Sequence, residues 1–370
     1  MKIALVTETF LPSTDGVVTR LTNAVDYMVK NDHEVIIICP DIEGIEEEYN
    51  GAKIYPMPAF TFFFYTQRAW SLPSLKIKEI FEEFKPDIVH AVNPISLAAS
   101  GVHYAKKLGI PLICSFHTNT PKYLDHYNFS FLKPHIWNFL KDLHNSAKIN
   151  LVTSEAMHNL LEANGIEGLR VLPIGVDTVN RNEKFYCEKM RAKLTDGEVD
   201  KILLIFVGRL APEKEIESLK ELMDSRDDIR LAIIGDGPSR VELEDLFKDT
   251  NTVFTGFLKG EELSKAYASG DAFIFPSVSE TLGLVITESM ASGTPVIAAY
   301  SEPTIEQIKD RENGLIYQRN SLSSLNACID SLKDLDLYDK IKQNGRKYAE
   351  NFSWENASRA MVEAYEETII

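Results

Sequence analysis

Residues 276–297 read PSVSETLGLVITESMASGTPVI, and this stretch decides how the second half of the chain is interpreted. It lies between two short apolar runs, DAFIFPS at 271–277 and TPVIAA at 294–299, and its centre has the apolar spacing of a helix. A strand, a helix and a second strand form the unit from which parallel sheets are built. Two glutamates, Glu280 and Glu288, flank Gly283 within it.

The same alternation of apolar runs and amphipathic segments extends along the whole chain. Continuous apolar strands separated by helical segments predict parallel sheets that are covered on both faces. A polar interval at 180–200 separates two sets of strands, so we expect two doubly wound α/β domains in tandem. The predicted strands lie within KIALVTE, HEVIIICP, PDIVHAV, IPLICSFH, INLVTS and LRVLPI in the first set, and KILLIFVGR, IRLAIIGDG, NTVFTGF, DAFIFPS and TPVIAA in the second.

Composition narrows the class of protein. The 370 residues carry a net charge of -16, which argues against nucleic acid as a partner, because phosphate backbones require a basic surface. The four cysteines form no CxxC pair, and free thiols in a reducing cytoplasm are the expected state. The N-terminus MKIALVTETF is too short an apolar run for a signal peptide, and no run approaches the roughly 20 residues of a membrane span. We therefore expect a soluble protein that is able to touch a membrane surface.

Functional side chains are expected directly after the strands, because ligands of doubly wound sheets gather at the carboxyl ends. After ILLIFV comes GRLAPEK, in which Gly208 allows close backbone approach, while Arg209 and Lys214 suit a diphosphate. The alternative is a pair of solvated charges at a helix start. After IRLAII comes GDGPSR, which lacks the third glycine of the dinucleotide fingerprint and is therefore a weak indicator of NAD.

Glu280 follows a predicted strand, and Gly283 opens the predicted helix after it. Backbone amides around Gly283 and Leu284 would form an anion site that the helix dipole strengthens. Glu288 lies more than one turn farther along and could accept hydrogen bonds from a pair of hydroxyls. The two carboxylates would then hold the two ends of one ligand, with phosphates between them. The alternative is two ordinary surface glutamates.

Four stretches together resemble a known family: TETFLPSTDGVVTRL at 7–21, GRLAPEK at 208–214, IIGDGP at 233–238 and SETLGLVITESMASGTPVIA at 279–298. In order and spacing they are similar to the retaining family-four glycosyltransferases. This resemblance implies the GT-B fold, in which two Rossmann-like domains face a cleft and the C-terminal helix returns to the first. The expected domains are an acceptor-binding domain, 1–176 with the returning segment 351–370, and a nucleotide-sugar-binding domain, 177–350.

The resemblance also implies roles for individual residues. Arg209 and Lys214 match the cations that bind the donor diphosphate, and Glu288 matches the glutamate that binds the ribose. Glu280 matches the glutamate that orients the sugar hydroxyls, and His117 matches the active-site histidine. The implied catalytic residues are His117, Glu280, Arg209 and Lys214, and the implied donor contacts are Gly16, Arg209, Lys214, Gly235, Leu258, Glu280, Leu282, Gly283, Leu284 and Glu288.

Some features depart from the family pattern or have a simpler interpretation. Asp15 occupies a position that is usually a second glycine, so the phosphate loop around Gly16 is expected to be stiffer. His90, in DIVHAVNP, is interpreted as a structural histidine, and the same role is the alternative for His117. No metal or other cofactor is expected, because Arg209, Lys214 and a helix start can neutralise the diphosphate.

The implied reaction is a front-face transfer with retention, in which the departing phosphate helps to deprotonate the acceptor. Residues 121–140 and 253–283 resemble sulfoquinovosyl diacylglycerol synthases and related glycolipid glycosyltransferases. This favours transfer of a hexose-type sugar from a UDP-sugar to a hydroxyl of a membrane lipid such as diacylglycerol. The alternatives are a GDP-mannose-dependent mannosyltransferase, a transferase to a soluble acceptor, a UDP-sugar epimerase, a nicotinamide oxidoreductase without its GxGxxG motif, and a non-catalytic sensor of nucleotide sugars.

Residues 59–78, AFTFFFYTQRAWSLPSLKIK, are rich in aromatic and basic residues and contain no acidic residue. One interpretation is a buried strand and a loop, with Phe62 and Phe64 directed into the core. The other is a surface segment that enters a bilayer interface and meets anionic headgroups. In that case the enzyme is cytoplasmic and peripheral at the inner face of the membrane. The expected acceptor contacts are Tyr123, Arg68 and Trp70.

Overall fold

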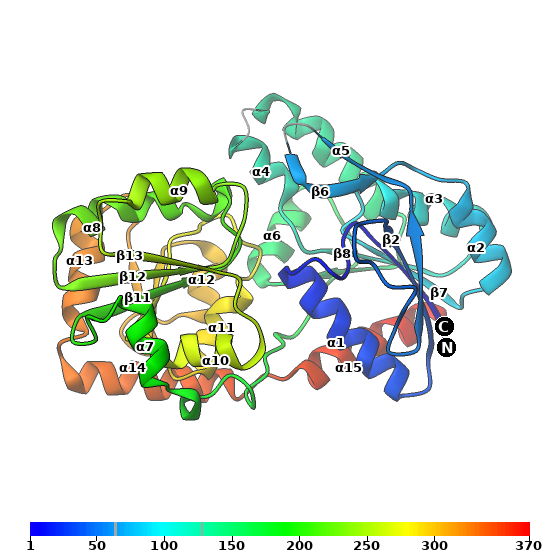
Figure 1. The fold of residues 1–370 in the computed structure, drawn as a ribbon. Helices are drawn as coiled ribbons and strands as arrows, with labels where there is room; N and C mark the ends of the chain where they lie inside the picture. The colour runs from blue at the N-terminus through cyan, green and yellow to red at the C-terminus, as the bar shows by residue number, and fades with distance from the viewer. Residues whose placement is uncertain (63–64, 127–128) are drawn as a thin grey trace. The chain divides into compact units, whose positions relative to one another are not determined.

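The computed structural model describes residues 1–62, 65–126 and 129–370, and for residues 62, 65–68, 123 and 126 it describes the backbone alone. The chain divides into two compact units (Figure 1). Unit 1 comprises Met1–Gly175 and Trp354–Ile370, and unit 2 comprises Val176–Ser353. The predicted crossings between domains, at 176/177 and 350/351, lie one and three residues from these divisions.

Within its described residues, unit 1 is built on an eight-stranded sheet in the order β10-β9-β8-β7-β1-β2-β4-β3. All neighbours pair in parallel except β3, which is antiparallel to β4. The strands are β1 (Lys2–Thr7), β2 (Glu34–Pro40), β3 (Glu48–Tyr49), β4 (Ala52–Met57), β7 (Ile88–Val92), β8 (Leu112–Phe116), β9 (Ile149–Val152) and β10 (Leu169–Val171). The helices are α1 (Gly16–Lys30), α2 (Lys76–Phe84), α3 (Leu97–Leu108), α4 (Thr120–His126), η1 (Ser130–Leu132), α5 (Lys133–His144), α6 (Glu155–Ala163) and α15 (Trp354–Ile369).

Both faces of this sheet are covered, as the continuous apolar strands predict. Along β1, Ile3 and Leu5 pack into one buried cluster, whereas Ala4 and Val6 pack into another on the opposite face. The first cluster includes Tyr365 and other residues of α15, which lies beside α1 (Figure 1). The C-terminal helix therefore completes the core of unit 1.

Unit 2 is built on a six-stranded sheet, entirely parallel, in the order β13-β12-β11-β14-β15-β16. Its strands are β11 (Ile202–Val207), β12 (Ile229–Ile234), β13 (Thr252–Gly256), β14 (Ala272–Phe275), β15 (Val296–Ala299) and β16 (Leu315–Tyr317). Its helices are η2 (Glu183–Phe185), α7 (Glu188–Leu194), η3 (Pro212–Lys214), η4 (Ile216–Leu219), α8 (Lys220–Ser225), α9 (Arg240–Phe247), α10 (Gly260–Ser269), α11 (Leu284–Ala291), α12 (Glu302–Gln307), α13 (Leu322–Ser331) and α14 (Leu335–Ala349). The two Rossmann-like α/β domains predicted from the sequence are thus confirmed.

Several parts of the chain differ from the sequence interpretation. The polar interval 180–200 does not simply join two domains, because η2 and α7 fold onto unit 2 and Arg191 pairs with Asp271 at 2.9 Å. Strands β3, β4 and β16 were not predicted. Strands β5 (Ala59–Phe62) and β6 (Tyr65–Ser71) pair with each other in a separate antiparallel sheet. Across the described residues, no helix has the length and apolar character that crossing a membrane requires.

Candidate active site

The predicted donor-binding residues of unit 2 follow the carboxyl ends of its strands, whereas Gly16 belongs to unit 1. Because all six strands are parallel, their carboxyl ends meet along one edge of the sheet. Arg209 follows β11, Gly235 follows β12, and Leu258 follows β13 by two residues. The loop that carries Glu280 follows β14 and leads into α11.

The two cations after β11 are both engaged by carboxylates. Arg209 forms an ion pair with Glu213, and Lys214 forms one with Glu280. Ser277 Oγ lies 3.3 Å from Glu280 Oε1 and donates to the Glu213 backbone oxygen at 2.9 Å, so it connects the two loops. The structure therefore brings Lys214 and Glu280 together, as an acidic–basic pair at the edge where a diphosphate is expected.

The start of α11 has a backbone conformation that suits glycine. Gly283 has a φ of +83°, and a Cβ atom there would lie 3.1 Å from the Phe275 ring. Gln307, which is buried, donates its side-chain amide to the Leu282 oxygen and so fixes the preceding turn. The amides of the first helical turn, at Leu284 and after, lie at the positive end of the helix.

Glu288 lies one turn into α11 with its carboxylate held by two residues that sequence reasoning missed. The Tyr267 hydroxyl donates to Glu288 Oε2 at 3.1 Å, and Arg181 Nη2 lies 4.0 Å from Oε1. Arg181 also lies over the Tyr267 ring and donates to Ser264 Oγ at 2.8 Å. Burial raises the pKa of Glu288, and the nearby Arg181 charge and the Tyr267 hydrogen bond oppose that rise.

The glycines of the turn after β12 are required by close packing against the loop after β11. A Cβ atom at Gly235 would lie 1.9 Å from the Gly208 oxygen, and one at Gly237 would lie 2.3 Å from the Leu210 oxygen. The glycines thus allow the loops after β11 and β12 to cross. The role of Gly235 and Leu258 as donor contacts stays a prediction.

In unit 1, His117 directly follows β8 and is 9% exposed. Its Nε2 lies 2.9 Å from Ser115 Oγ, and its backbone amide donates to Asn93 Oδ1 at 3.2 Å. Burial lowers the pKa of His117 well below its usual value, and the charge of Arg20 lowers it further. The imidazole is therefore neutral at neutral pH, which suits a hydrogen-bonding role.

Asp15, which precedes Gly16 in the expected phosphate loop, has a structural role in the start of α1. Asp15 is the N-cap of α1 and accepts hydrogen bonds from the amides of Val17 and Val18, both at 2.9 Å. Two amides of the first turn are thus already occupied by a carboxylate. A contact of a phosphate with Gly16 would have to use other groups of this loop.

The acceptor contacts named from the sequence are described only in part. Trp70 lies on β6, paired with Phe60 of β5. The side chains of Tyr123 and Arg68 lie outside what the structure describes, as do Phe64 and the side chain of Phe62. Phe60 is 38% exposed, so this end of the hairpin is not a fully buried strand.

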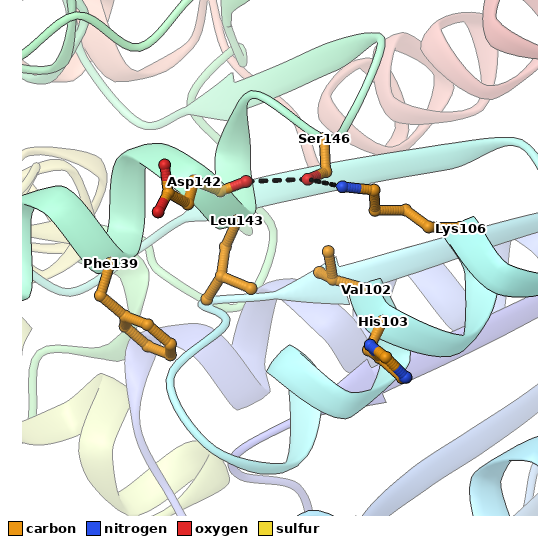
Figure 2. A pocket seen from close by; sticks show the side chains of 7 residues that line it. All are labelled: Val102, His103, Lys106, Phe139, Asp142, Leu143 and Ser146. Atoms are coloured by element: carbon orange, nitrogen blue, oxygen red, sulfur yellow. Dashed lines mark hydrogen bonds between the residues drawn. The ribbon is translucent and has the colours of Figure 1, made fainter.

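A separate pocket of about 230 Å³ lies on unit 1 between α3 and α5 (Figure 2). Lys106 donates to Ser146 Oγ at 3.0 Å, and Ser146 donates to the Asp142 oxygen at 2.8 Å, along one side. None of the predicted site residues lines it, and we assign it no part in donor binding. Its lining is Val102, His103, Lys106, Phe139, Asp142, Leu143 and Ser146.

Comparison with known proteins shows the family of the chain. Residues 14–180 match the family described as Glycosyltransferase Family 4, and residues 188–348 match Glycosyl transferases group 1. Sulfoquinovosyl transferase SQD2 of Arabidopsis thaliana is 38% identical over 93% of this chain and 69% of its own length. A GDP-mannose-dependent alpha-mannosyltransferase of Mycolicibacterium smegmatis is 33% identical over 80% of this chain and 79% of its own.

Two further matches come from a lipid-modifying enzyme and a solved structure. Alpha-monoglucosyldiacylglycerol synthase of Streptococcus pneumoniae is 28% identical over 86% of this chain and 75% of its own length. The crystal structure of Anabaena HepE in complex with UDP aligns with a TM-score of 0.80 at 17% identity, over 99% of this chain and 100% of HepE. At that identity the structural match shows the fold alone.

The two Rossmann-like units and the site at the carboxyl edge of unit 2 define a glycosyltransferase of the GT-B type. More narrowly, the sequence matches show that the chain belongs to glycosyltransferase family 4.

Proposed function

We propose that the protein is a retaining hexosyltransferase that moves a sugar from a UDP-sugar to a hydroxyl of a membrane lipid such as diacylglycerol. The observation that carries this proposal is the pair of basic side chains after β11, each held on a carboxylate beside the start of α11. Such a cluster suits a nucleoside diphosphate whose negative charge grows as the sugar leaves.

In the proposed reaction, the bond between the sugar C1 and the diphosphate oxygen breaks while the acceptor oxygen approaches C1 from the same face. The proton of the acceptor hydroxyl passes to the departing phosphate. Arg209, Lys214 and the amides at the start of α11 stabilise that phosphate without a metal ion. Glu280 orients the sugar hydroxyls, and Glu288 accepts hydrogen bonds from the ribose hydroxyls.

Relatives support the lipid acceptor. One similar protein is named for diacylglycerol and another for sulfoquinovosyl transfer. Exposed aromatic side chains of the kind that a lipid surface would contact are also present on unit 1: among the side chains that the structure describes, four of the five exposed phenylalanines lie there. Those in unit 1 are Phe60, Phe129, Phe131 and Phe139, and the one in unit 2 is Phe257.

A GDP-mannose donor is the second candidate, because a relative with 33% identity is named as GDP-mannose-dependent. The purified protein should be incubated separately with UDP-glucose, UDP-galactose, UDP-sulfoquinovose and GDP-mannose, each with vesicles that contain diacylglycerol. Mass spectrometry of the lipid extract should detect a glycosylated diacylglycerol from a UDP-sugar. A glycolipid from GDP-mannose alone would overturn the proposed donor, and conversion of the UDP-sugar to its epimer without transfer would overturn the reaction.

A further inference from the structure

A buried chain of polar side chains runs through unit 1 from the C-terminal helix to His117. The Tyr365 hydroxyl lies 2.7 Å from His90 Nδ1, and His90 Nε2 lies 2.7 Å from Ser115 Oγ. Ser115 Oγ in turn lies 2.9 Å from His117 Nε2. Tyr365 comes from α15, His90 from β7 and Ser115 from β8, so segments far apart in the sequence meet behind His117.

These hydrogen-bonded side chains are shielded from solvent. The side chains of Tyr365, His90 and Ser115 are 0% exposed. Burial lowers the pKa of His90 to about 3, and the pKa of His117 also lies well below its usual value. Each imidazole is therefore neutral near pH 7 and carries one hydrogen, on either of its two nitrogens.

The Tyr365 hydroxyl sets the direction of the hydrogen bonds. Among the described residues, His90 is its one hydrogen-bond partner, and a buried O–H group without an acceptor is costly. Tyr365 therefore donates to His90 Nδ1, and the hydrogen of His90 resides on Nε2. His90 then donates to Ser115, which leaves the Ser115 hydroxyl hydrogen to be donated to His117 Nε2.

If the hydrogen bonds ran in the opposite direction, one buried hydroxyl group would be left without an acceptor among the side chains that the structure describes. If His117 donated from Nε2 to Ser115, then Ser115 would donate to His90 and His90 would donate to Tyr365. The Tyr365 hydrogen would then point into the core of unit 1 without an acceptor among the described residues. Because such a group loses its hydrogen bond to water with no replacement, the first direction is favoured.

We infer that Tyr365 and His90 are positioning residues that act through Ser115 to hold His117 as the tautomer with its hydrogen on Nδ1. This inference rests on the proposed function for its consequence: His117 Nε2 is occupied as an acceptor from Ser115, so His117 does not serve the reaction as a base from Nε2. The last helix of the chain thereby fixes the chemistry of a residue after β8.

Nuclear magnetic resonance of protein labelled with ¹⁵N-histidine reads these tautomers directly, because protonated and unprotonated ring nitrogens have different shifts. His144 provides a reference in the same spectrum. Its Nδ1 lies 2.7 Å from Asn150 Oδ1, and the Asn150 amide group donates to two backbone oxygens, so His144 must carry its hydrogen on Nδ1. Signals of His90 and His117 are assigned by His90→Gln and His117→Gln.

The wild-type spectrum should show hydrogen on Nε2 of His90 and on Nδ1 of His117. Tyr365→Phe should convert both residues to mixtures of tautomers, whereas Ser115→Ala should affect His117 and leave His90 as it was. His144 should not change in either variant. A wild-type His117 with its hydrogen on Nε2, or an unchanged His117 in both variants, would overturn the inference. If Tyr365→Phe does not fold, Ser115→Ala and the wild-type spectrum still decide.

Activity measurements separate this inference from the proposed function. Tyr365→Phe should lower kcat for sugar transfer on the order of tenfold, with little change in KM for the donor, as is usual when a supporting hydrogen bond is lost. Tyr338→Phe removes a half-buried hydroxyl contact in unit 2, to the Asp271 backbone oxygen at 3.1 Å, and should leave kcat unchanged. If no donor gives transfer, the proposed function fails. The tautomer of His117 still tests whether Tyr365 and His90 position it through Ser115.

Discussion

At the level of single residues, the basic side chains after β11 are already paired with carboxylates. Lys214 contacts Glu280 and Arg209 contacts Glu213, so a bound diphosphate must share or displace carboxylates. Lys214 and Glu280 are largely shielded from water, with side chains 19% and 16% exposed. This shielding strengthens the attraction that a phosphate would feel at the site.

Lys214→Met should lower kcat by about 10²–10³-fold, because it removes a charge from the position where the leaving phosphate becomes more negative. Steady-state assays of sugar transfer measure the effect. Lys220→Met is the matched control, since Lys220 forms an ion pair with Asp224 on α8 and should be dispensable. Equal activity in Lys214→Met and the wild type would mean that the loop is ordinary surface.

The two glutamates of 276–297 should respond differently to loss of charge. Glu288→Gln should weaken binding of UDP itself, because its carboxylate is expected on the ribose, whereas Glu280→Gln should leave UDP affinity near the wild-type value and reduce discrimination between sugars. Titration calorimetry with UDP compares the two variants. The same loss of UDP affinity in both would contradict the separate roles.

Some residues of the candidate site could be predicted from the sequence, and others could not. Glu280 and Glu288 could be singled out because each follows a predicted strand or helix start. Arg181 and Tyr267 could not, because one stands in a polar interval and the other looks like an ordinary core residue of a helix. Their meeting on Glu288 depends on how α10 packs near α11, which no local pattern specifies.

At the element scale, most strands were predictable from their apolar runs, including the three-residue β10, whereas β3, β4 and β16 were not. The parallel strands β1, β2, β11 and β12 are buried on both faces and therefore read as continuous apolar sequence. By contrast, β4 contains Lys53 and Pro56, and β16 has three residues. Their pairing comes from the neighbouring strand and not from their own pattern.

Buried histidines on the elements of unit 1 make its stability depend on pH. Burial lowers the pKa of His90 to about 3 and that of His144 to about 4, below the value of 6.5 for an unfolded chain. Because the folded-state pKa is lowered, each histidine contributes stability that is present above about pH 6.5 and is lost as the pH falls toward the folded value.

His144→Gln should therefore flatten this dependence by about 1.4 kcal/mol per pH unit between pH 6 and 4.5. Urea unfolding followed by tryptophan fluorescence measures it, and this signal reports on unit 1 because Trp70, Trp137 and Trp354 all lie there. If the wild type and the variant lose stability with the same slope, His144 is not neutral and buried in the native state.

At the scale of the whole molecule, two domains could be predicted from the repeated strand pattern, and the return of α15 to unit 1 came from the family resemblance alone. Nothing local in residues 354–369 indicates which sheet they cover. The structure shows that Met361, Val362 and Tyr365 fill the core of unit 1. An amphipathic helix specifies that it needs a partner but not which partner it takes.

Association with a membrane should depend on the exposed side chains at 72–76 in unit 1. Leu72 and Leu75 are 65% and 72% exposed, and Lys76 follows them. The combined change Leu72→Ser, Leu75→Ser and Lys76→Gln should reduce sedimentation with vesicles of anionic lipid, and the wild-type binding should weaken with salt.

Leu335→Ser is the control for this experiment, because Leu335 is an equally exposed leucine, at 74%, but belongs to unit 2. It should bind vesicles as the wild type does. Vesicle binding that is unaffected by the triple change would place the membrane contact elsewhere on the protein.

The configuration at C1 of the transferred sugar is the most direct test of a retaining transfer to lipid. A donor panel of α-linked UDP-sugars with ¹³C at C1 is incubated with diacylglycerol vesicles, and the extracted glycolipid is examined by nuclear magnetic resonance. Retention of configuration should give an α-linked glycolipid in the wild-type reaction, and this product should be lost in Lys214→Met. A β-linked product, or release of free sugar with no lipid product from any donor, would contradict a retaining transfer to lipid.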